Sequence, residues 1–221
     1  MDLKAKIPSP TVKRLSLYFR ELGERRAVDS DATMSSRQLG DALGFSDAQV
    51  RKDLAFVGQL GHPGVGYSVT LLHDNLRRIL GRDRSWEAAL VGAGNIGRAL
   101  LSYRRFEVQN FHITRVFDNN PATIGSTISE RSVLDISELE RELADAGTHL
   151  GIIAVPAQDA QAIAERLIGV GVGGILNFAP RRLEVDESVA VLNVDFSLTL
   201  EQLAFQVNLG RNDPAREGES S

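Results

Sequence analysis

Three glycines lie close together in the middle of the chain, in the stretch Gly92-Ala-Gly-Asn-Ile-Gly97. An apolar run precedes Gly92 and helix-forming residues follow from Arg98, so the stretch predicts a strand, a tight turn and a helix start. The first glycine would reverse the chain, the second would let bare backbone approach a pyrophosphate, and the third would let the helix pack close to the strand. The predicted contacts to such a ligand are Gly92, Ala93, Gly94, Asn95, Ile96 and Gly97.

Asp118 follows a second apolar stretch, residues 112–117, and lies 21 residues beyond Gly97. A carboxylate near this spacing, at the carboxyl end of the second strand, accepts hydrogen bonds from the 2′-OH of an adenosine ribose and repels a 2′-phosphate. Asn119 and Asn120 come next, and no adjacent arginine is present to bind such a phosphate. The pattern therefore favours NAD(H) over NADP(H) as the ligand.

Strands and helices alternate from Trp86 onward. We expect strands at 87–92, 112–118, 150–155, 173–178 and 189–194, and helices from Asn95, at 136–146 and at 158–169. The alternation predicts an α/β domain with a Rossmann-type, doubly wound parallel sheet, in which ligands bind at the carboxyl edge of the strands. Two of the strands end there in Val155-Pro156 and in Asn177-Phe178, which adds these four residues to the candidate site.

The N-terminal part of the chain predicts several helices. Residues 12–22 have apolar side chains at helical spacing, and Ser35 with Gln38 and Ser46 with Gln49 both match a helix capping box. Only a tight turn at Gly44 separates the two capped helices, so the pair predicts a helix-turn-helix. Their inward faces are expected to hold Leu39, Ala42 and Leu43 in the first helix and Val50, Leu54 and Val57 in the second.

Gln49, Arg51 and Lys52 would then point away from the core. Gln reads adenine edges, Arg reads guanine and Lys neutralises phosphate, so this face suits a DNA major groove; a plain solvated face is the alternative interpretation. The glycine-rich stretch 61–67, an alternating strand at 68–71 and a helix at 72–80 predict the hairpin, or wing, of a winged helix. The candidate DNA contacts are Ser46, Gln49, Arg51, Lys52, His62, Gly64 and Tyr67.

Charge is distributed unevenly along the chain. The net charge of −4 is the sum of +4 over residues 1–85 and −8 over residues 86–221, and all four lysines lie in the first 52 residues. This favours a polyanion-binding head on an acidic body. The chain has no cysteine, which excludes disulfides and thiolate metal sites, and no apolar run approaches membrane-spanning length. We expect a cytoplasmic protein that holds no metal.

Six segments, taken in order, resemble Rex, a family of bacterial redox-sensing transcriptional repressors. They are QVRKDL at 49–54, GVGY at 64–67, GAGNIG at 92–97, FDNNP at 117–121, ILNFAP at 175–180 and NVDF at 193–196. The resemblance covers nearly the whole chain. It departs from the family at Pro63, where members usually carry a basic residue before GVGY, so a minor-groove cation of the wing is missing or supplied differently.

The resemblance implies a homodimer that binds a palindromic operator, with binding permitted by NAD+ and released by NADH. It also implies a C-terminal helix, which the apolar spacing predicts at 199–209, that is swapped between protomers. In the family's pattern Phe196 of the partner subunit would lie beside the nicotinamide, while Asp195 would pair with Tyr103 in one state and with Arg20 in the other. The expected domains are a winged helix over 1–83, an NAD(H)-binding domain over 84–197, the swapped helix over 198–211 and a disordered tail over 212–221.

Two other classes of function have to be weighed. A dinucleotide fold more often belongs to an oxidoreductase, but hydride transfer usually needs a His, Lys or Tyr near the nicotinamide, and none occurs after His149. A regulatory module that binds another nucleotide, such as coenzyme A, is the second alternative. Asp118 argues against it, because a carboxylate there favours a free ribose diol. The favoured reading is a non-enzymatic sensor.

Overall fold

The computed structural model describes residues 7–58, 61–62, 65–144 and 146–211. Two compact units divide the chain, Met1–Arg84 and Ser85–Ser221. The first unit buries one hydrophobic core. The second unit buries two, one on each face of its sheet.

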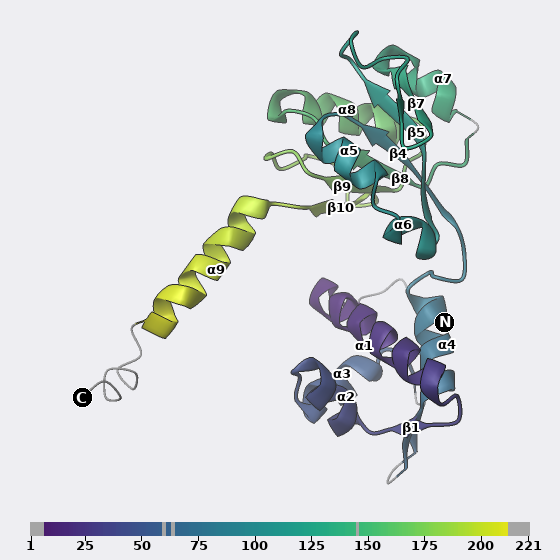
Figure 1. Cartoon of the computed structure of the whole chain (residues 1–221), viewed down its shortest axis with the longest axis vertical. Helices are drawn as coiled ribbons and strands as arrows, with labels where there is room; N and C mark the ends of the chain where they lie inside the picture. Colours follow the sequence, from purple (N-terminus) through teal and green to yellow (C-terminus); the bar gives the residue numbers. More distant parts are fainter. Residues whose placement is uncertain (1–6, 59–60, 63–64, 145, 212–221) are drawn as a thin grey trace. The chain divides into compact units, whose positions relative to one another are not determined.

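The described part of the first unit holds four helices and a small antiparallel sheet (Figure 1). The helices are α1 (Ser9–Val28), α2 (Ser36–Leu43), α3 (Asp47–Leu54) and α4 (Val69–Ile79). The strands are β1 (Thr33–Met34), β2 (Gly61–His62) and β3 (Gly66–Ser68), in the order β1-β3-β2. The α2–α3 pair and the β2–β3 hairpin form the predicted winged helix-turn-helix.

Caps at the helix starts follow the sequence closely. At α2 the capping box is complete, because Ser35 Oγ accepts from Gln38 N at 3.2 Å and Gln38 Oε1 accepts from Ser35 N at 2.8 Å. At α3 only half of the expected box forms: Ser46 Oγ accepts from Gln49 N at 3.2 Å, while the Gln49 side chain turns to Asp53. The helix start therefore depends on a single side-chain bond there.

Two other local predictions in this unit are wrong. Residues 68–71 do not extend a strand, because Ser68 Oγ accepts from Leu71 N at 3.4 Å and α4 begins at Val69. Ala42 is exposed, whereas Gly40 is buried. A Cβ on Gly40 would lie only 2.3 Å from the carbonyl oxygen of Phe45, so this position brings α2 against the turn that leads to α3.

The second unit is built on a seven-stranded sheet. Six strands run parallel in the order β7-β5-β4-β8-β9-β10, and β6 pairs antiparallel with β7 at one edge. The direction of winding reverses between β4 and β8, and ligands bind at the carboxyl end of such a reversal. The strands are β4 (Trp86–Val91), β5 (Phe111–Asp118), β6 (Thr127–Ile128), β7 (Arg131–Asp135), β8 (Leu150–Ile153), β9 (Gly174–Asn177) and β10 (Ala190–Asn193).

Helices cover the two faces of this sheet unequally. Ala89 and Val91 of β4 pack with α7 (Leu139–Leu143) and α8 (Ala157–Gly169) on one face. Ala88 and Leu90 point to the other face, where they pack near α5 (Asn95–Leu101) and α6 (Arg105–Val108). The alternation along β4 thus places its carboxyl end between two buried layers (Figure 1).

Three short elements of the second unit, α6, β6 and β7, were not predicted from the sequence, and neither was β1 in the first unit. Only Val133 is buried in β7 and only Ile128 in β6, so neither strand has the continuous apolar run of β4. The helix expected at 136–146 is a 3-10 turn, Ile136–Glu138, followed by the short α7.

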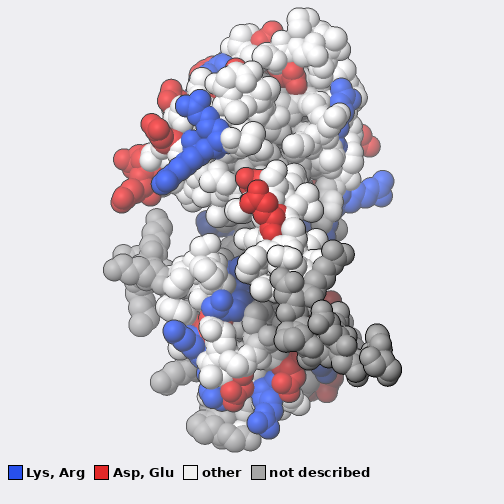
Figure 2. All heavy atoms as spheres, turned by 90° about the vertical axis from the view of Figure 1, so that its left-hand side faces the viewer, with Lys and Arg blue, Asp and Glu red and all other residues white. Residues whose placement is uncertain are grey.

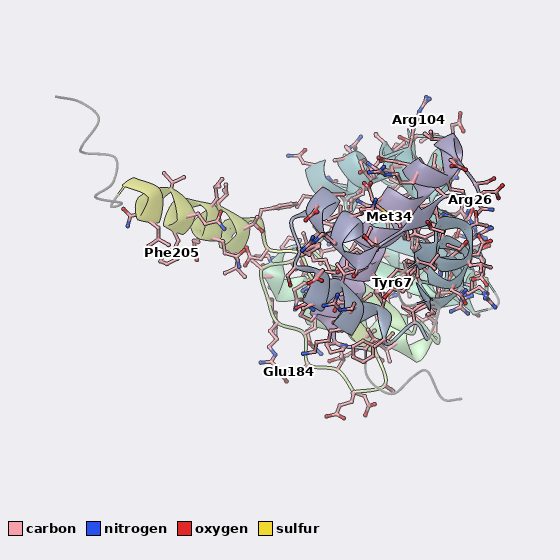
Figure 3. The ribbon with its side chains drawn as sticks, turned by 90° about the horizontal axis from the view of Figure 1, so that it is seen from below. Arg26, Met34, Tyr67, Arg104, Glu184 and Phe205 are labelled. Carbon is pink, nitrogen blue, oxygen red and sulfur yellow. The ribbon has the colours of Figure 1, made fainter. Side chains whose placement is uncertain are left out.

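The last helix, α9 (Phe196–Arg211), differs from every other helix in its burial. All its described side chains, residues 196–209, are exposed, including Leu200 at 64% and Phe205 at 63%. Figure 3 shows its side chains, Phe205 among them, projecting around the helix without covering neighbours. A helix this apolar is normally buried, but the described part of the chain does not bury α9.

Candidate functional site

Two of the three glycines in the turn after β4 are required by the packing of the protein itself. Gly92 has a φ of +100°, and a Cβ there would lie 2.4 Å from the carbonyl oxygen of Ala154. A Cβ on Gly97 would lie 2.0 Å from the carbonyl oxygen of Gly92. The first glycine therefore allows the left-handed turn beside β8, and the third brings α5 against the turn.

Gly94 is different, because no atom of the described residues requires a glycine there. Its backbone is extended, with φ −72° and ψ −161°, and a Cβ would meet no atom within 4 Å. A side chain at this position would fill open space beside the turn. The bare backbone of Gly94 fits a ligand that approaches closely, as the pyrophosphate of a dinucleotide does.

Asp118 ties the end of β5 to this turn. Its Oδ2 accepts from Ala93 N at 2.6 Å and its Oδ1 accepts from Asn120 N at 2.8 Å. A carboxylate has about four acceptor positions, so both oxygens keep capacity for a hydroxyl donor. The residue can hold the turn and a ribose at once.

A cavity of about 530 Å³ opens at the carboxyl ends of β4, β5 and β8. Six of the predicted cofactor residues line it: Gly92, Ala93, Gly94, Asp118, Val155 and Pro156. Six others lie outside this lining: Asn95, Ile96, Gly97, Asn177, Phe178 and Phe196. Of these, Asn95 and Ile96 are exposed in the first turn of α5.

Asn177 has a structural place that the sequence did not reveal. It is fully buried; its Nδ2 donates to the Arg181 carbonyl at 2.8 Å and to Asn193 Oδ1 at 2.9 Å, and its Oδ1 accepts from Ala179 N. The side chain therefore holds the loop after β9 to β10. The aromatic rings of Phe178 and Phe196 lie with centroids 6.2 Å apart.

Arg98 is a cavity residue that the sequence analysis missed. It lines the cavity four residues beyond Gly94, and its N–H donates to the Gly94 carbonyl at 2.9 Å. The i, i+4 spacing from Gly94 was the available signal, since such residues share one face of a helix. Arg166 also lines the cavity; it pairs with Glu140 at 2.6 Å, and this hydrogen bond lowers the pKa of Glu140 to about 2.

The three predicted switch residues occupy separate environments. Asp195 caps α9, because its Oδ1 accepts from Ser197 N at 2.8 Å and from Leu198 N at 3.1 Å. Tyr103 is half exposed and packs edge-on against Phe106, with centroids 5.0 Å apart. Arg20 is exposed on α1. The pairing of Asp195 with Tyr103 or Arg20 stays a prediction.

Two of the DNA contacts predicted on α3 lie on its exposed face, but Gln49 does not point fully away from the core as predicted: it is half-buried and its amide donates to the buried Asp53. Arg51 and Lys52 are exposed, and Arg51 Nη1 pairs with Asp47 Oδ2 at 2.6 Å. Figure 2 shows basic side chains interspersed with acidic ones over the first unit on the face turned to the viewer. A DNA phosphate or base that binds Arg51 would replace Asp47 as its partner.

The wing is described only in part. Tyr67 pairs with Met34 across the sheet, and its ring packs over Gly61, where a Cβ would lie 2.7 Å from the ring. Tyr67 therefore braces the hairpin against the core. Gly64, Pro63 and the side chain of His62 lie outside the described residues.

Other kinds of site find no support in the described residues. No helix in them is long and apolar enough to cross a membrane. No group of three or more His, Asp or Glu side chains that could hold a metal ion occurs in the same part of the chain.

Comparison with known proteins identifies the family. The model of a DNA-binding protein N-terminus matches residues 6–55, and that of the CoA binding domain matches residues 83–181. The redox-sensing transcriptional repressor Rex of Carboxydothermus hydrogenoformans is 46% identical over 202 residues, covering 91% of this chain and 97% of that protein. This chain belongs to the Rex family.

Solved Rex-family structures have the same fold. RSP, a Rex-family repressor in complex with β-NAD+ and operator DNA, is 33% identical with a TM-score of 0.88, covering 98% of this chain and all of RSP. RSP in complex with β-NADH is also 33% identical, with a TM-score of 0.80 over 93% of this chain and 96% of that one. Rex-family relatives at 42–46% identity are named repressors and not enzymes, so the Rossmann fold serves regulation here.

Proposed function

We propose that this chain represses transcription as a homodimer on palindromic operator DNA, and that binding of NADH in the cavity after β4 releases the DNA. The observation that carries the proposal is Gly94, where a Cβ would face open space among the described residues. It supports a ligand with a pyrophosphate, and the α3 face supports a DNA partner.

The dinucleotide would be held by this chain's own groups around the cavity. The backbone of Gly92, Ala93 and Gly94 would bind the pyrophosphate, and Asp118 would accept from the adenosine ribose. Arg98 adds a positive charge beside the same turn. The carboxylate at 118 favours NAD(H) over a ligand with a 2′-phosphate, because two anions would repel.

The redox response needs a difference between the two forms of the nicotinamide, which is cationic in NAD+ and neutral in NADH. An apolar surround disfavours the cation, and Pro156 and Phe178 supply apolar surface from this chain. A ligand shifts a two-state equilibrium only by its difference in affinity, about 5 kcal/mol for a change from 1:99 to 99:1. We expect NADH to prefer the released state by an amount of this order.

A second copy of the chain would complete the molecule. The apolar side chains of α9 are exposed, and the sheet face formed by β4, β8, β9 and β10 carries an apolar hollow of about 330 Å³, lined by residues such as Ile152, Leu176 and Leu192. A homodimer could bury both surfaces and so remove their apolar side chains from water.

Light scattering should give a dimer for the wild type and a monomer for Phe205→Glu. Val28→Glu, at an exposed apolar residue of α1, is the control and should remain a dimer.

A gel shift tests the function directly. A palindromic duplex selected from a random library by the full-length protein is incubated with it while NAD+ and NADH are titrated against each other. Release by NADH and restoration by NAD+ are expected. Binding that ignores both nucleotides, or no selected duplex at all, would overturn the proposal.

Coenzyme A is the control ligand, since the CoA binding domain model matches residues 83–181, which include the lining of the cavity after β4. In a thermal-shift assay, NADH should raise the melting temperature and coenzyme A at equal concentration should not displace it. Displacement of NADH by coenzyme A would favour coenzyme A as the ligand of this cavity.

A further inference from the structure

One buried carboxylate lies directly beneath the predicted DNA-reading face. Asp53, on the inner side of α3, is only 1% exposed. Four side chains donate hydrogen bonds to it: Thr11 at 3.3 Å, Arg14 at 2.6 and 2.7 Å, Tyr18 at 2.8 Å and Gln49 at 3.0 Å. Three of these donors come from α1, so the carboxylate joins α1 to the helix that carries Gln49, Arg51 and Lys52.

The network keeps Asp53 ionised. Burial alone would raise the pKa of this carboxyl, but hydrogen bonds from Arg14, Tyr18 and Gln49 outweigh burial and leave the pKa below its ordinary value. An ionised carboxylate accepts hydrogen bonds and donates none. Every group that faces it must therefore present a donor.

This requirement fixes the orientation of the Gln49 amide. A half rotation of a side-chain amide exchanges the positions of its oxygen and nitrogen. A partner selects one of these two orientations only if it can accept but not donate hydrogen bonds, or donate but not accept them. Gln49 Nε2 donates to Asp53 Oδ1, so Oε1 points away from the carboxylate. No hydrogen bond to Gln49 Oε1 is present within the described residues.

We propose that Asp53 is a positioning residue for base recognition, which presents Gln49 to the DNA with its Oε1 as the outward acceptor. The inference rests on the proposed operator binding. In the major groove, Gln49 Oε1 can accept from the amino group of adenine or cytosine. The second N–H of its Nε2, which Asp53 does not use, can donate to adenine N7. Gln49 is thereby set for adenine before the DNA arrives.

Asp53→Asn tests this assignment, because an amide at position 53 offers both a donor and an acceptor and lets the Gln49 amide adopt either orientation. The probe is the palindromic duplex selected with the wild-type protein, together with duplexes that carry one symmetric base-pair change each. We expect affinity for the selected duplex to fall about tenfold and the preference at one base pair to disappear. Affinity for a random duplex should change by no more than about twofold.

Two matched controls separate positioning from charge and from stability. Asp41→Asn removes the same charge from an exposed position on α2 and should strengthen binding to both duplexes slightly, the opposite of Asp53→Asn. Tyr18→Phe removes a donor from Oδ2 of the same carboxylate and leaves the Gln49 contact on Oδ1. It should lower the melting temperature and keep the base preference.

A measurement on the wild-type protein covers the case in which Asp53→Asn fails to fold. In a ¹⁵N-labelled sample, the side-chain amide of Gln49 is assigned by its loss in Gln49→Met. One of its amide protons should exchange with water more slowly than the side-chain amide protons of Gln38. Gln38 is the reference because its Oε1 accepts from Ser35 N and Ser35 Oγ, so its side chain is hydrogen-bonded through the oxygen.

The outcomes are distinguishable. If the wild type selects no duplex, the proposed function fails. If it does, but folded Asp53→Asn keeps the wild-type base preference, or if both Gln49 amide protons exchange as fast as those of Gln38, the positioning role is overturned.

Discussion

The carboxylate of Asp118 accepts a hydrogen bond of 2.6 Å from the backbone N–H of Ala93, so the end of β5 holds the turn that follows β4. The residue predicted to bind the adenosine ribose therefore also holds the turn that is predicted to bind the pyrophosphate. Substitutions at Asp118 should therefore act on two parts of one ligand.

Asp118→Asn should weaken NADH binding by about 1–3 kcal/mol, because a charge-assisted hydrogen bond is replaced by a neutral one. It should weaken NADPH binding less, since the repulsion of a 2′-phosphate is also lost. Titration calorimetry with both nucleotides measures this. Asp159→Asn, which changes another carboxylate of the cavity lining, is the control and should leave the ratio of the two affinities unchanged.

Gly94→Ala and Gly97→Ala should separate ligand binding from folding. A Cβ at position 94 meets no protein atom, so the melting temperature should stay within about 2 °C of the wild type while NADH affinity falls more than about tenfold. A Cβ at position 97 would lie 2.0 Å from the Gly92 carbonyl, so Gly97→Ala should lower the melting temperature clearly. Normal NADH binding by Gly94→Ala would contradict the location of the pyrophosphate.

Arg51→Ala should cost about 1–3 kcal/mol on the selected operator and much less on random DNA, as expected for a base contact. An equal loss on both duplexes would make Arg51 a phosphate contact. Asp47→Asn provides the complement: it releases Arg51 from its 2.6 Å ion pair and should raise operator affinity. Competition gel shifts on both duplexes provide the comparison.

Asp195→Ser should retain NADH binding and impair release of the operator. Serine is as good a helix N-cap as aspartate, so the start of α9 is kept while the carboxylate that would change partners is removed. Asp186→Ala, at an exposed carboxylate that accepts from Ser188 N, is the control. Full release of Asp195→Ser by NADH would rule out the switch role.

The stability of the first unit should depend on acid pH through Asp53. A carboxyl whose folded pKa is depressed stabilises the fold above its unfolded pKa of about 4, and this stabilisation is lost as the pH falls through the folded value. Asp53→Asn should therefore be less stable than the wild type at pH 7, and the gap should narrow below about pH 4. Thermal melts between pH 7 and pH 3 measure the gap; a constant gap would contradict the linkage.

Much of the fold could be predicted because apolar spacing and caps are local signals. Gly92 and Asp118 define the ends of β4 and β5 through residue type and spacing alone. Residues 68–71 show the limit: the alternation is that of a strand, but the Ser68 cap begins a helix there. Short edge strands such as β7 bury too little apolar surface to leave a periodic pattern.

Site residues could be predicted where they lie at the end of a single strand. They were harder to predict where side chains from several helices and strands come together. Asp53 was overlooked because it lies between Val50 and Leu54 on a face read as apolar, and its donors on α1 are at least 35 residues away in sequence. Asn177 has the right position for a ligand contact, but only the structure shows that Asn193 and Arg181 already occupy its amide.

The clamp at Asn177 also limits where α9 can pivot. Asn177 Nδ2 holds Asn193, and the Asn177 carbonyl accepts from Val194 N at 2.8 Å, while α9 begins at Phe196. No slack chain separates the sheet from the helix, and Asp195 alone forms the joint. A force applied along α9 would therefore be transmitted to the loop that carries Phe178, rather than absorbed by a linker.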